Sequence, residues 1–173
     1  MQGRLRPNVS EIDHFNQMPE ARARTELEAC LAVPRWVYEV LSGRPYSTVD
    51  ELLTAADRAA ARLSAEEIEA ALARHPRIGE RAGAGHDGAF SSAEQAAVDS
   101  EDIAVATALA AGNAEYESIF DRVFLIRAAG RSSDEILAEL KRRLHNSPEA
   151  ETAEVVEQLG EIARLRLEQV VAR

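Results

Sequence analysis

The chain has 173 residues, which predicts one domain spanning residues 1–173 and suffices to bury a core without disulfides. Its formal net charge of -10 argues against nucleic-acid binding, because phosphate binding depends on Lys and Arg side chains. A single cysteine excludes an internal disulfide and favours a cytoplasmic protein, and without an apolar signal-peptide core or membrane-length stretch we expect no contact with a membrane.

Helix start and stop signals dominate the first half of the chain, which is rich in Ala, Leu, Glu and Arg. Proline favours the first position of a helix and glycine the position after the last. Ser or Thr followed three residues later by Glu forms a capping box. These signals predict four helices, at residues 19–31, 34–43, 48–63 and 64–74. The fold class expected from them is all-α, a single-domain bundle of several helices.

A glycine-rich stretch interrupts this pattern at residues 76–90, which hold four of the nine glycines. A stretch of that length without secondary structure predicts an active-site loop. The same signals predict later helices from Ser91 to a stop at Gly112, and at residues 114–120, 132–144 and 148–171. The composition of residues 123–130, VFLIRAAG, also permits an extended conformation.

His75 is a polar residue at a position where the helical period calls for an apolar one. It follows Ile68, Ala71 and Leu72 on the inward stripe of its helix. Pro76 disfavours helical geometry at His75, so the helix should end there. A histidine at such a place is more often structural. Its position between a helix end and a glycine-rich loop favours function, because histidine changes charge near neutral pH.

Arg166 is the second such residue. It shares the apolar stripe of the last helix with Leu159, Ile162 and Val170, whereas Arg164 points away from that stripe. A buried charge costs several kcal/mol unless it is paired, so Arg166 either meets a buried carboxylate or faces a ligand. The alternative is that its long side chain reaches solvent from the helix end.

Glu94 is the third, because it lies on the apolar face of its predicted helix. A capping box formed by Ser91 and Glu94 explains both residues without any function. If His75, Glu94 and Arg166 meet in one cavity, they supply a proton-transferring group, a carboxylate that orients it and a cation for an oxyanion. Such a set suits acid–base chemistry but does not name a reaction.

One motif, HPRIGERA at residues 75–82, begins the glycine-rich stretch, and another, S-x-x-E-Q at residues 91–95, follows it. Further blocks lie on both sides of these motifs: FNQMP (15–19) and RPYS (44–47) before them, and VFLIRAAGRSSDEIL (123–137), RLHN (143–146) and IARLRL (162–167) after them. Together they resemble the 2-oxo-4-hydroxy-4-carboxy-5-ureidoimidazoline (OHCU) decarboxylases over nearly the whole chain. The resemblance implies a carboxy-lyase that converts OHCU to (S)-allantoin in urate degradation.

The resemblance also implies the roles of individual residues. His75 and Glu94 fall on the catalytic positions. The substrate-binding positions are Pro76, Ser91, Gln95, Phe124, Ile126 and Arg166, with backbone groups contributing around residues 124–126. Neither a metal nor a cofactor is implied, because the substrate's own imine or carbonyl can accept the electrons left by CO2. The partner implied is the small-molecule ureidoimidazoline, and a homodimer is expected because members of the family are often dimers.

The chain departs from the family just before the VFL block. Members commonly carry an aromatic–glycine–aromatic run there, whereas this chain has FDR at residues 120–122. The departure leaves open a helical binding module that keeps the pocket without turnover. A third alternative is a metal hydrolase using His75, His86 and Asp87, which depends only on ligand-type residues in or beside a loop.

Overall fold

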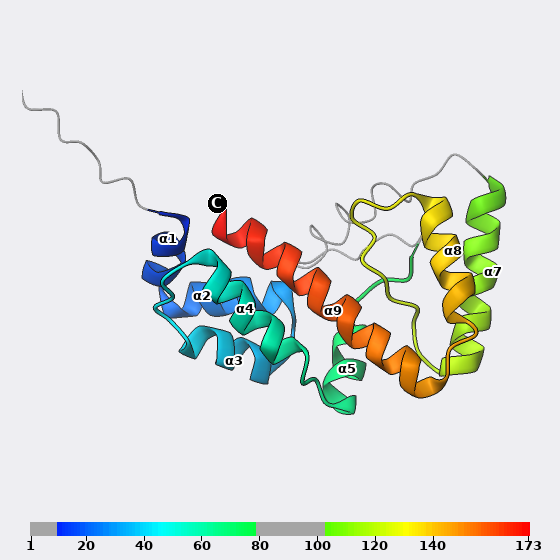
Figure 1. The fold of residues 1–173 in the computed structure, drawn as a ribbon, viewed down its shortest axis with the longest axis horizontal. Coiled ribbons are helices and arrows are strands. Elements are labelled where there is room, and N and C mark those ends of the chain that lie inside the picture. Colours follow the sequence, from blue (N-terminus) through cyan, green and yellow to red (C-terminus); the bar gives the residue numbers. More distant parts are fainter. Residues whose placement is uncertain (1–9, 79–102) are drawn as a thin grey trace, which may run out of the picture.

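The computed structural model describes residues 10–78 and 103–173, and within these ranges it contains eight helices and no strand (Figure 1). The helices are α1 (Glu11–Gln17), α2 (Glu20–Cys30), α3 (Pro34–Ser42), α4 (Val49–Ala60), α5 (Ala65–Leu72), α7 (Ile103–Phe120), α8 (Ser133–Arg143) and α9 (Pro148–Val171). None of the helices in these ranges combines the length and apolarity needed to cross a bilayer. The expected all-α class is confirmed.

Local capping explains why the helix boundaries follow the sequence signals. The predicted helices that correspond to α2, α3, α4, α5, α8 and α9 agree with them to within three residues at each end. At α5, the Glu67 amide donates to the Ser64 hydroxyl at 3.2 Å, and the Ser64 amide donates to the Glu67 carboxylate at 2.9 Å. The Ser-x-x-Glu pattern misses α1, because Asp13 replaces Glu in the capping box that Ser10 begins.

The predicted helix stop at Gly112 is wrong, because α7 runs unbroken from Ile103 to Phe120. A β-carbon on Gly112 would lie only 2.7 Å from Cδ2 of Leu140 on α8. Glycine at this position therefore allows α7 and α8 to pack closely and does not end the helix. The predicted start at Ser91 and most of the glycine-rich loop lie outside the described residues.

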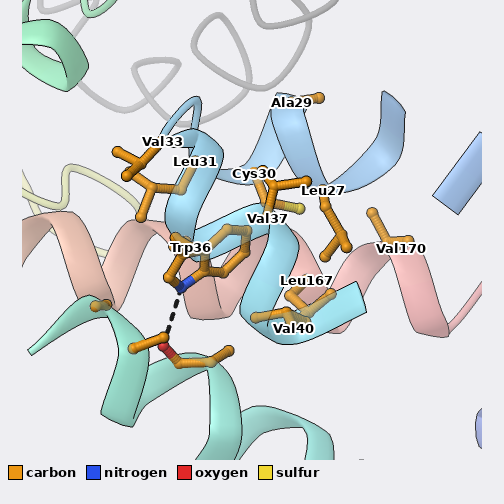
Figure 2. Close-up of a cluster of buried hydrophobic side chains, with 14 of the residues drawn as sticks. Leu27, Ala29, Cys30, Leu31, Val33, Trp36, Val37, Val40, Leu167 and Val170 are labelled. Atoms are coloured by element: carbon orange, nitrogen blue, oxygen red, sulfur yellow. Dashed lines mark hydrogen bonds between the residues drawn. The ribbon is translucent and has the colours of Figure 1, made fainter. Parts of the chain in front are cut away.

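Helix α9 extends along most of the molecule (Figure 1). Helices α1 to α4 lie beside its carboxyl-terminal part, and α7 and α8 lie at its amino-terminal end. The larger hydrophobic cluster is formed by α1 to α5 with α9. Its centre is the fully buried Trp36, whose indole N–H donates to the Ala56 carbonyl at 2.9 Å (Figure 2). A second cluster is formed by α7, α8 and the segment between them.

The segment between α7 and α8 connects the two clusters. Leu125 belongs to the larger cluster, whereas Phe124 and Ile126 belong to the second. Alternation of neighbouring side chains between two faces is typical of an extended chain. The structure thus places VFLI in an extended arrangement that pairs with no strand among the described residues.

Candidate active site

His75 lies just after the last turn of α5 and is half-buried, as is Pro76. Its backbone amide donates to the Leu72 carbonyl at 3.0 Å, and its ring Nδ1 lies 2.9 Å from the Ala71 carbonyl oxygen. A carbonyl oxygen only accepts hydrogen bonds, so Nδ1 is the nitrogen that carries the proton. In the neutral ring, the lone pair that can take up a further proton is therefore on Nε2.

Residues 77 and 78 fasten the chain after His75 to α7. Arg77 binds Glu117 with both branches of its guanidinium, Nε at 2.5 Å from Oε1 and the terminal nitrogen at 2.9 Å from Oε2. This pairing lowers the pKa of Glu117. Ile78 is buried in the second cluster, and its carbonyl accepts a hydrogen bond from Asn113 Nδ2 at 3.2 Å. The catalytic candidate is thus held between α5 and α7.

Side chains from α8 and α9 hold one backbone edge of the extended segment. The Leu125 carbonyl accepts a hydrogen bond from Arg143 at 2.7 Å. The Arg127 amide donates to Oε1 of Gln158 at 2.9 Å. The Leu125 carbonyl and the Arg127 amide point to the same side of an extended chain, so this edge is occupied.

The opposite edge carries the backbone groups of Phe124 and Ile126. In an extended chain, the N–H and C=O groups of alternate residues point to the same side. Phe124 and Ile126 are 1% and 3% exposed. Within the part of the chain that the structure describes, neither residue has a backbone hydrogen bond. Buried backbone groups without a partner are rare in proteins, so this edge is a candidate ligand-binding surface.

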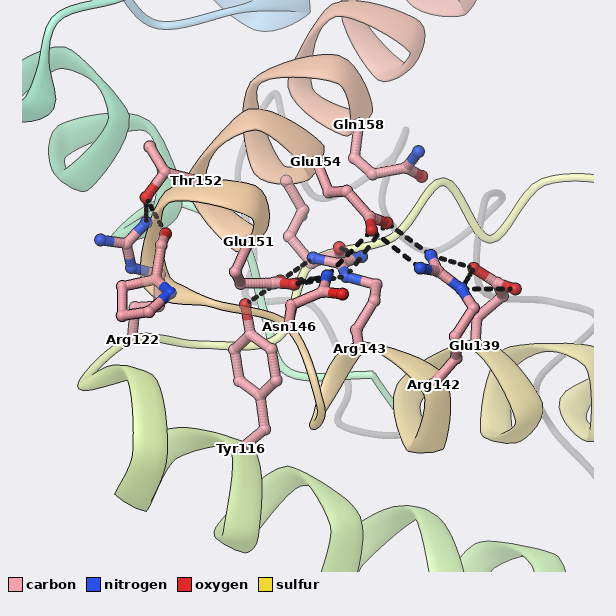
Figure 3. A network of polar contacts seen from close by, with 12 residues as sticks. Tyr116, Arg122, Glu139, Arg142, Arg143, Asn146, Glu151, Thr152, Glu154 and Gln158 are labelled. Atoms are coloured by element: carbon pink, nitrogen blue, oxygen red, sulfur yellow. Dashed lines mark hydrogen bonds and ion pairs between the residues drawn. The ribbon is translucent and has the colours of Figure 1, made fainter.

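A buried ion pair contacts the extended segment through Arg143 (Figure 3). Arg143 and Glu151 have side chains that are 0% and 1% exposed, and Nε of Arg143 donates to Glu151 Oε1 at 3.0 Å. The Tyr116 hydroxyl donates to the same oxygen at 2.5 Å, and Asn146 donates to Oε2 at 2.8 Å. Burial and the Glu151 carboxylate raise the pKa of Tyr116 far above its ordinary value. The arginine also stacks on the Phe124 ring, 4.6 Å from its centroid.

Sequence reasoning misses this ion pair although the signal is present. Arg143 lies seven residues after Ile136 on the inward stripe of α8. Glu151 lies four residues before Val155 on the inward stripe of α9. The criterion that identifies Arg166, a charge on an apolar stripe, applies equally to these two residues.

Arg166 points into the core, as the helical register predicts. It is 2% exposed, and one terminal nitrogen donates to the Ala29 carbonyl of α2 at 3.2 Å. The Arg164 side chain is 37% exposed and pairs with Asp57 at 2.5 Å and Glu168 at 3.3 Å. The predicted inward direction of Arg166 and outward direction of Arg164 are therefore confirmed.

The structure brings the chain after His75 next to the extended segment. Ile78, Phe124 and Ile126 are members of the same hydrophobic cluster. Arg166, by contrast, is buried against α2, beside the larger cluster. The remaining predicted site residues, Ser91, Glu94 and Gln95, lie outside the described residues.

The Asp-Arg pair that departs from the family closes the carboxyl end of α7. Asp121 has a φ of 52°, the left-handed conformation that glycine adopts most readily, and its amide donates to the Glu117 carbonyl at 3.0 Å. Asp is among the residues that tolerate this conformation best after glycine, the residue that the resemblance leads us to expect here. Arg122 lies 3.4 Å from both Glu69 of α5 and Thr152 of α9. Asp121 therefore ends α7, and Arg122 connects that end to α5 and α9.

Two other candidate sites are a metal centre and a surface groove between α4 and α9. Within residues 10–78 and 103–173, no group of His, Cys, Asp and Glu side chains is arranged to hold a metal ion. His86 and Asp87, the other two residues of the metal-hydrolase alternative, lie outside these ranges. A surface groove of about 390 Å³ between α4 and α9 contains none of the predicted site residues.

Comparisons with known proteins identify one family. Residues 16–168 match the family model described as OHCU decarboxylase. The 2-oxo-4-hydroxy-4-carboxy-5-ureidoimidazoline decarboxylase of Haloferax volcanii is 32% identical over 135 residues, which cover 76% of this chain and 79% of the relative.

Two solved structures share the fold. One is a crystal structure of OHCU decarboxylase in the presence of (S)-allantoin, with a TM-score of 0.72 and 23% identity over 86% of this chain and 98% of the other. The second is a crystal structure of (S)-allantoin synthase, with a TM-score of 0.67 and 18% identity over 92% of this chain and 53% of the other. At these identities the two structures establish the fold alone. The match to the family model over most of the chain and the 32% identity to the Haloferax relative show that the chain belongs to the OHCU decarboxylase family.

Proposed function

We propose that this protein is a carboxy-lyase that decarboxylates OHCU to (S)-allantoin in urate degradation. The observation that carries the proposal is membership of the OHCU decarboxylase family over residues 16–168. The relative of Haloferax volcanii carries the name of the same activity, and the solved neighbours are an OHCU decarboxylase and an (S)-allantoin synthase.

Decarboxylation of OHCU requires that the substrate be held in one orientation and that a proton replace the lost CO2. Loss of CO2 leaves an electron pair on a ring carbon, and the neighbouring imine or carbonyl of the imidazolone accepts it. The protein therefore has to hold the breaking bond in line with that acceptor and deliver a proton to one face of the carbon. Fixed groups in a buried site can do both.

We assign the proton transfer to Nε2 of His75. The hydrogen bond from Nδ1 to the Ala71 carbonyl fixes the ring, so Nε2 is the nitrogen that first takes up a proton and then, as the imidazolium, donates it to the ring carbon that has lost CO2. The anchoring of Arg77 and Ile78 to α7 limits movement of the chain on the other side of the histidine. The role of Glu94, to orient His75 and support its charged form, follows from the resemblance alone.

We assign substrate binding to two kinds of group. The ureido and ring amides of OHCU alternate donors with acceptors, which matches the backbone edge of Phe124 and Ile126. Arg166 can stabilise an oxyanion or a carboxylate, and its burial would strengthen that interaction. The remaining proposed binding positions are Pro76, Ser91 and Gln95.

The proposal is tested by giving freshly prepared OHCU to the purified protein and following allantoin by circular dichroism. We expect optically active (S)-allantoin to form at a rate proportional to protein concentration, whereas buffer alone yields racemate. Binding of OHCU without faster loss of CO2 would contradict the proposal and would favour the binding-module alternative.

A cytoplasmic location and a homodimer also stay proposals. The one cysteine, Cys30, is buried, and a single cysteine allows no internal disulfide, which suits a reducing compartment. The homodimer follows from the resemblance to a family that often forms dimers. Sedimentation velocity at several protein concentrations tests it directly, and a monomer at every concentration would contradict it.

A further inference from the structure

Arg143 binds three different groups in a fully buried position. Its Nε donates to Glu151 on α9, and one terminal nitrogen donates to the Leu125 carbonyl at 2.7 Å. The guanidinium carbon lies over the Phe124 ring, 4.6 Å from its centroid. One side chain of α8 therefore holds both the extended segment and α9. Figure 3 shows its ion pair with Glu151.

Stability alone is a weak explanation for the Arg143–Glu151 pair. Removing two charges from water costs free energy that their attraction often fails to recover, and apolar residues of similar size can replace such pairs without loss. Apolar side chains could not, however, hold the Leu125 carbonyl. Arginine suits this task because its donors point in fixed directions within one plane, so it can bind a carboxylate and a carbonyl at once.

Because each peptide unit is planar, fixing a backbone group on one edge of the segment also fixes the direction of its partner group on the opposite edge. The Leu125 carbonyl and the Ile126 N–H belong to one trans peptide unit and point in opposite directions. The same holds for the Ile126 carbonyl and the Arg127 N–H. Fixing the Leu125 carbonyl by Arg143 therefore orients the Ile126 N–H, and fixing the Arg127 N–H by Gln158 orients the Ile126 carbonyl.

We infer that Arg143 and Gln158 are positioning residues for the decarboxylation, which aim the N–H and C=O of Ile126 at a ureide group of the substrate. A ureide carries an N–H next to a C=O, so it can form two parallel hydrogen bonds with such a backbone pair. Both backbone groups belong to a residue that is 3% exposed, and neither has a partner among the described residues. This inference depends on the proposed function.

The test compares Arg143→Lys with Arg142→Lys. Lysine keeps a positive charge beside Glu151 but cannot bind both the carboxylate and the Leu125 carbonyl in one plane. Arg142 is the matched control, because it is the adjacent residue and forms its ion pairs with Glu139 and Glu154 at the surface. Initial rates of (S)-allantoin formation over a range of OHCU concentrations give kcat and KM separately.

We expect Arg143→Lys to raise KM about tenfold and to change kcat less than about threefold, because hydrogen bonds to the ureide hold the substrate equally well before and during reaction. Arg142→Lys should keep both values. A purely structural role of Arg143 would lower the melting temperature and the active fraction, and so kcat, without a change in KM. An unchanged KM in folded Arg143→Lys overturns the inference.

A second variant covers the case in which Arg143→Lys does not fold. Gln158→Met removes the acceptor of the Arg127 N–H, while the ion pair of Arg143 with Glu151 stays intact. We expect it to raise KM in the same way, and an unchanged KM in this folded variant overturns the inference. Absence of turnover in the unmodified protein is a different result, because it contradicts the proposed function itself.

Discussion

Arg143 of α8 and Glu151 of α9 form an ion pair whose side chains are 0% and 1% exposed. The pair joins the two helices across the turn between them, and Asn146 from that turn donates to the same carboxylate at 2.8 Å. Tyr116 adds a hydrogen bond from α7. The second hydrophobic cluster is thereby attached to the start of α9 through polar contacts centred on a fully buried carboxylate.

Breaking this pair should destabilise the protein strongly. We expect Glu151→Gln to lower the free energy of unfolding by about 3 kcal/mol, because the buried Arg143 would lose its nearest counter-charge and keep only the more distant Glu154, at 3.8 Å. The control is Glu20→Gln, since the Glu20 and Arg24 side chains are 71% and 44% exposed, and its loss should be below about 0.5 kcal/mol. Urea unfolding measures both values, and equal losses would contradict the prediction.

Two helical glycines should respond to alanine with opposite signs. In Gly112→Ala, the new β-carbon would lie 2.7 Å from the buried Leu140, so we expect a net loss of about 1–2 kcal/mol. In Gly160→Ala, it would lie 3.6 Å from Ala60, an ordinary contact, so the helix propensity of alanine should add about 0.5–1 kcal/mol. Thermal unfolding gives both shifts. Destabilisation by Gly160→Ala would mean that α4 and α9 pack differently.

The left-handed conformation of Asp121 predicts a further stability order. Its φ of 52° suits glycine best, aspartate less well and alanine worse than either. We expect Asp121→Gly to be more stable than the natural protein and Asp121→Ala less stable, with about 1–2 kcal/mol between the two variants. Chemical denaturation measures this difference. If Asp121→Ala proves the more stable variant, α7 ends with another geometry.

The opposite directions of Arg166 and Arg164 predict opposite effects on turnover. Arg166→Ala should reduce kcat/KM by an amount equivalent to about 1–4 kcal/mol, the order found when a fixed oxyanion donor is removed. Arg164→Ala removes only half-exposed ion pairs with Asp57 and Glu168 and should stay close to the natural value. Steady-state kinetics on folded variants checks the ranking. The reverse ranking would argue against a role of Arg166 in substrate binding.

Replacing His75 should remove stereospecific proton delivery. We expect His75→Asn to keep the fold but to lower (S)-allantoin formation about 10²- to 10⁴-fold, because asparagine forms hydrogen bonds without titrating. His145 is the matched control, since its Nδ1 also lies 2.9 Å from a carbonyl four residues earlier, on an exposed helix end. Circular dichroism of the product distinguishes enzymatic (S)-allantoin from uncatalysed racemate. Near-normal formation of (S)-allantoin by His75→Asn would exclude it as the essential proton-handling residue.

The sequence by itself determines the features that depend on near neighbours along the chain. The capping box of Ser64 and Glu67 places the start of α5, because donor and acceptor lie three residues apart. The inward direction of Arg166 follows from the helical period, because residues three or four apart share a face. The HPRIGERA motif at residues 75–82 and the blocks that follow predict the family, since they preserve both identity and order.

Only the tertiary structure decides features that depend on contacts between distant residues. Gly112 looks like a helix stop in the sequence, but its purpose is to leave space for Leu140 of another helix. The direction of the Ile126 backbone groups is likewise set from outside the segment, by Arg143 and Gln158 on two separate helices. A side chain's hydrogen-bond partner depends on where folding places it in space, and that place is fixed only when the two hydrophobic clusters pack.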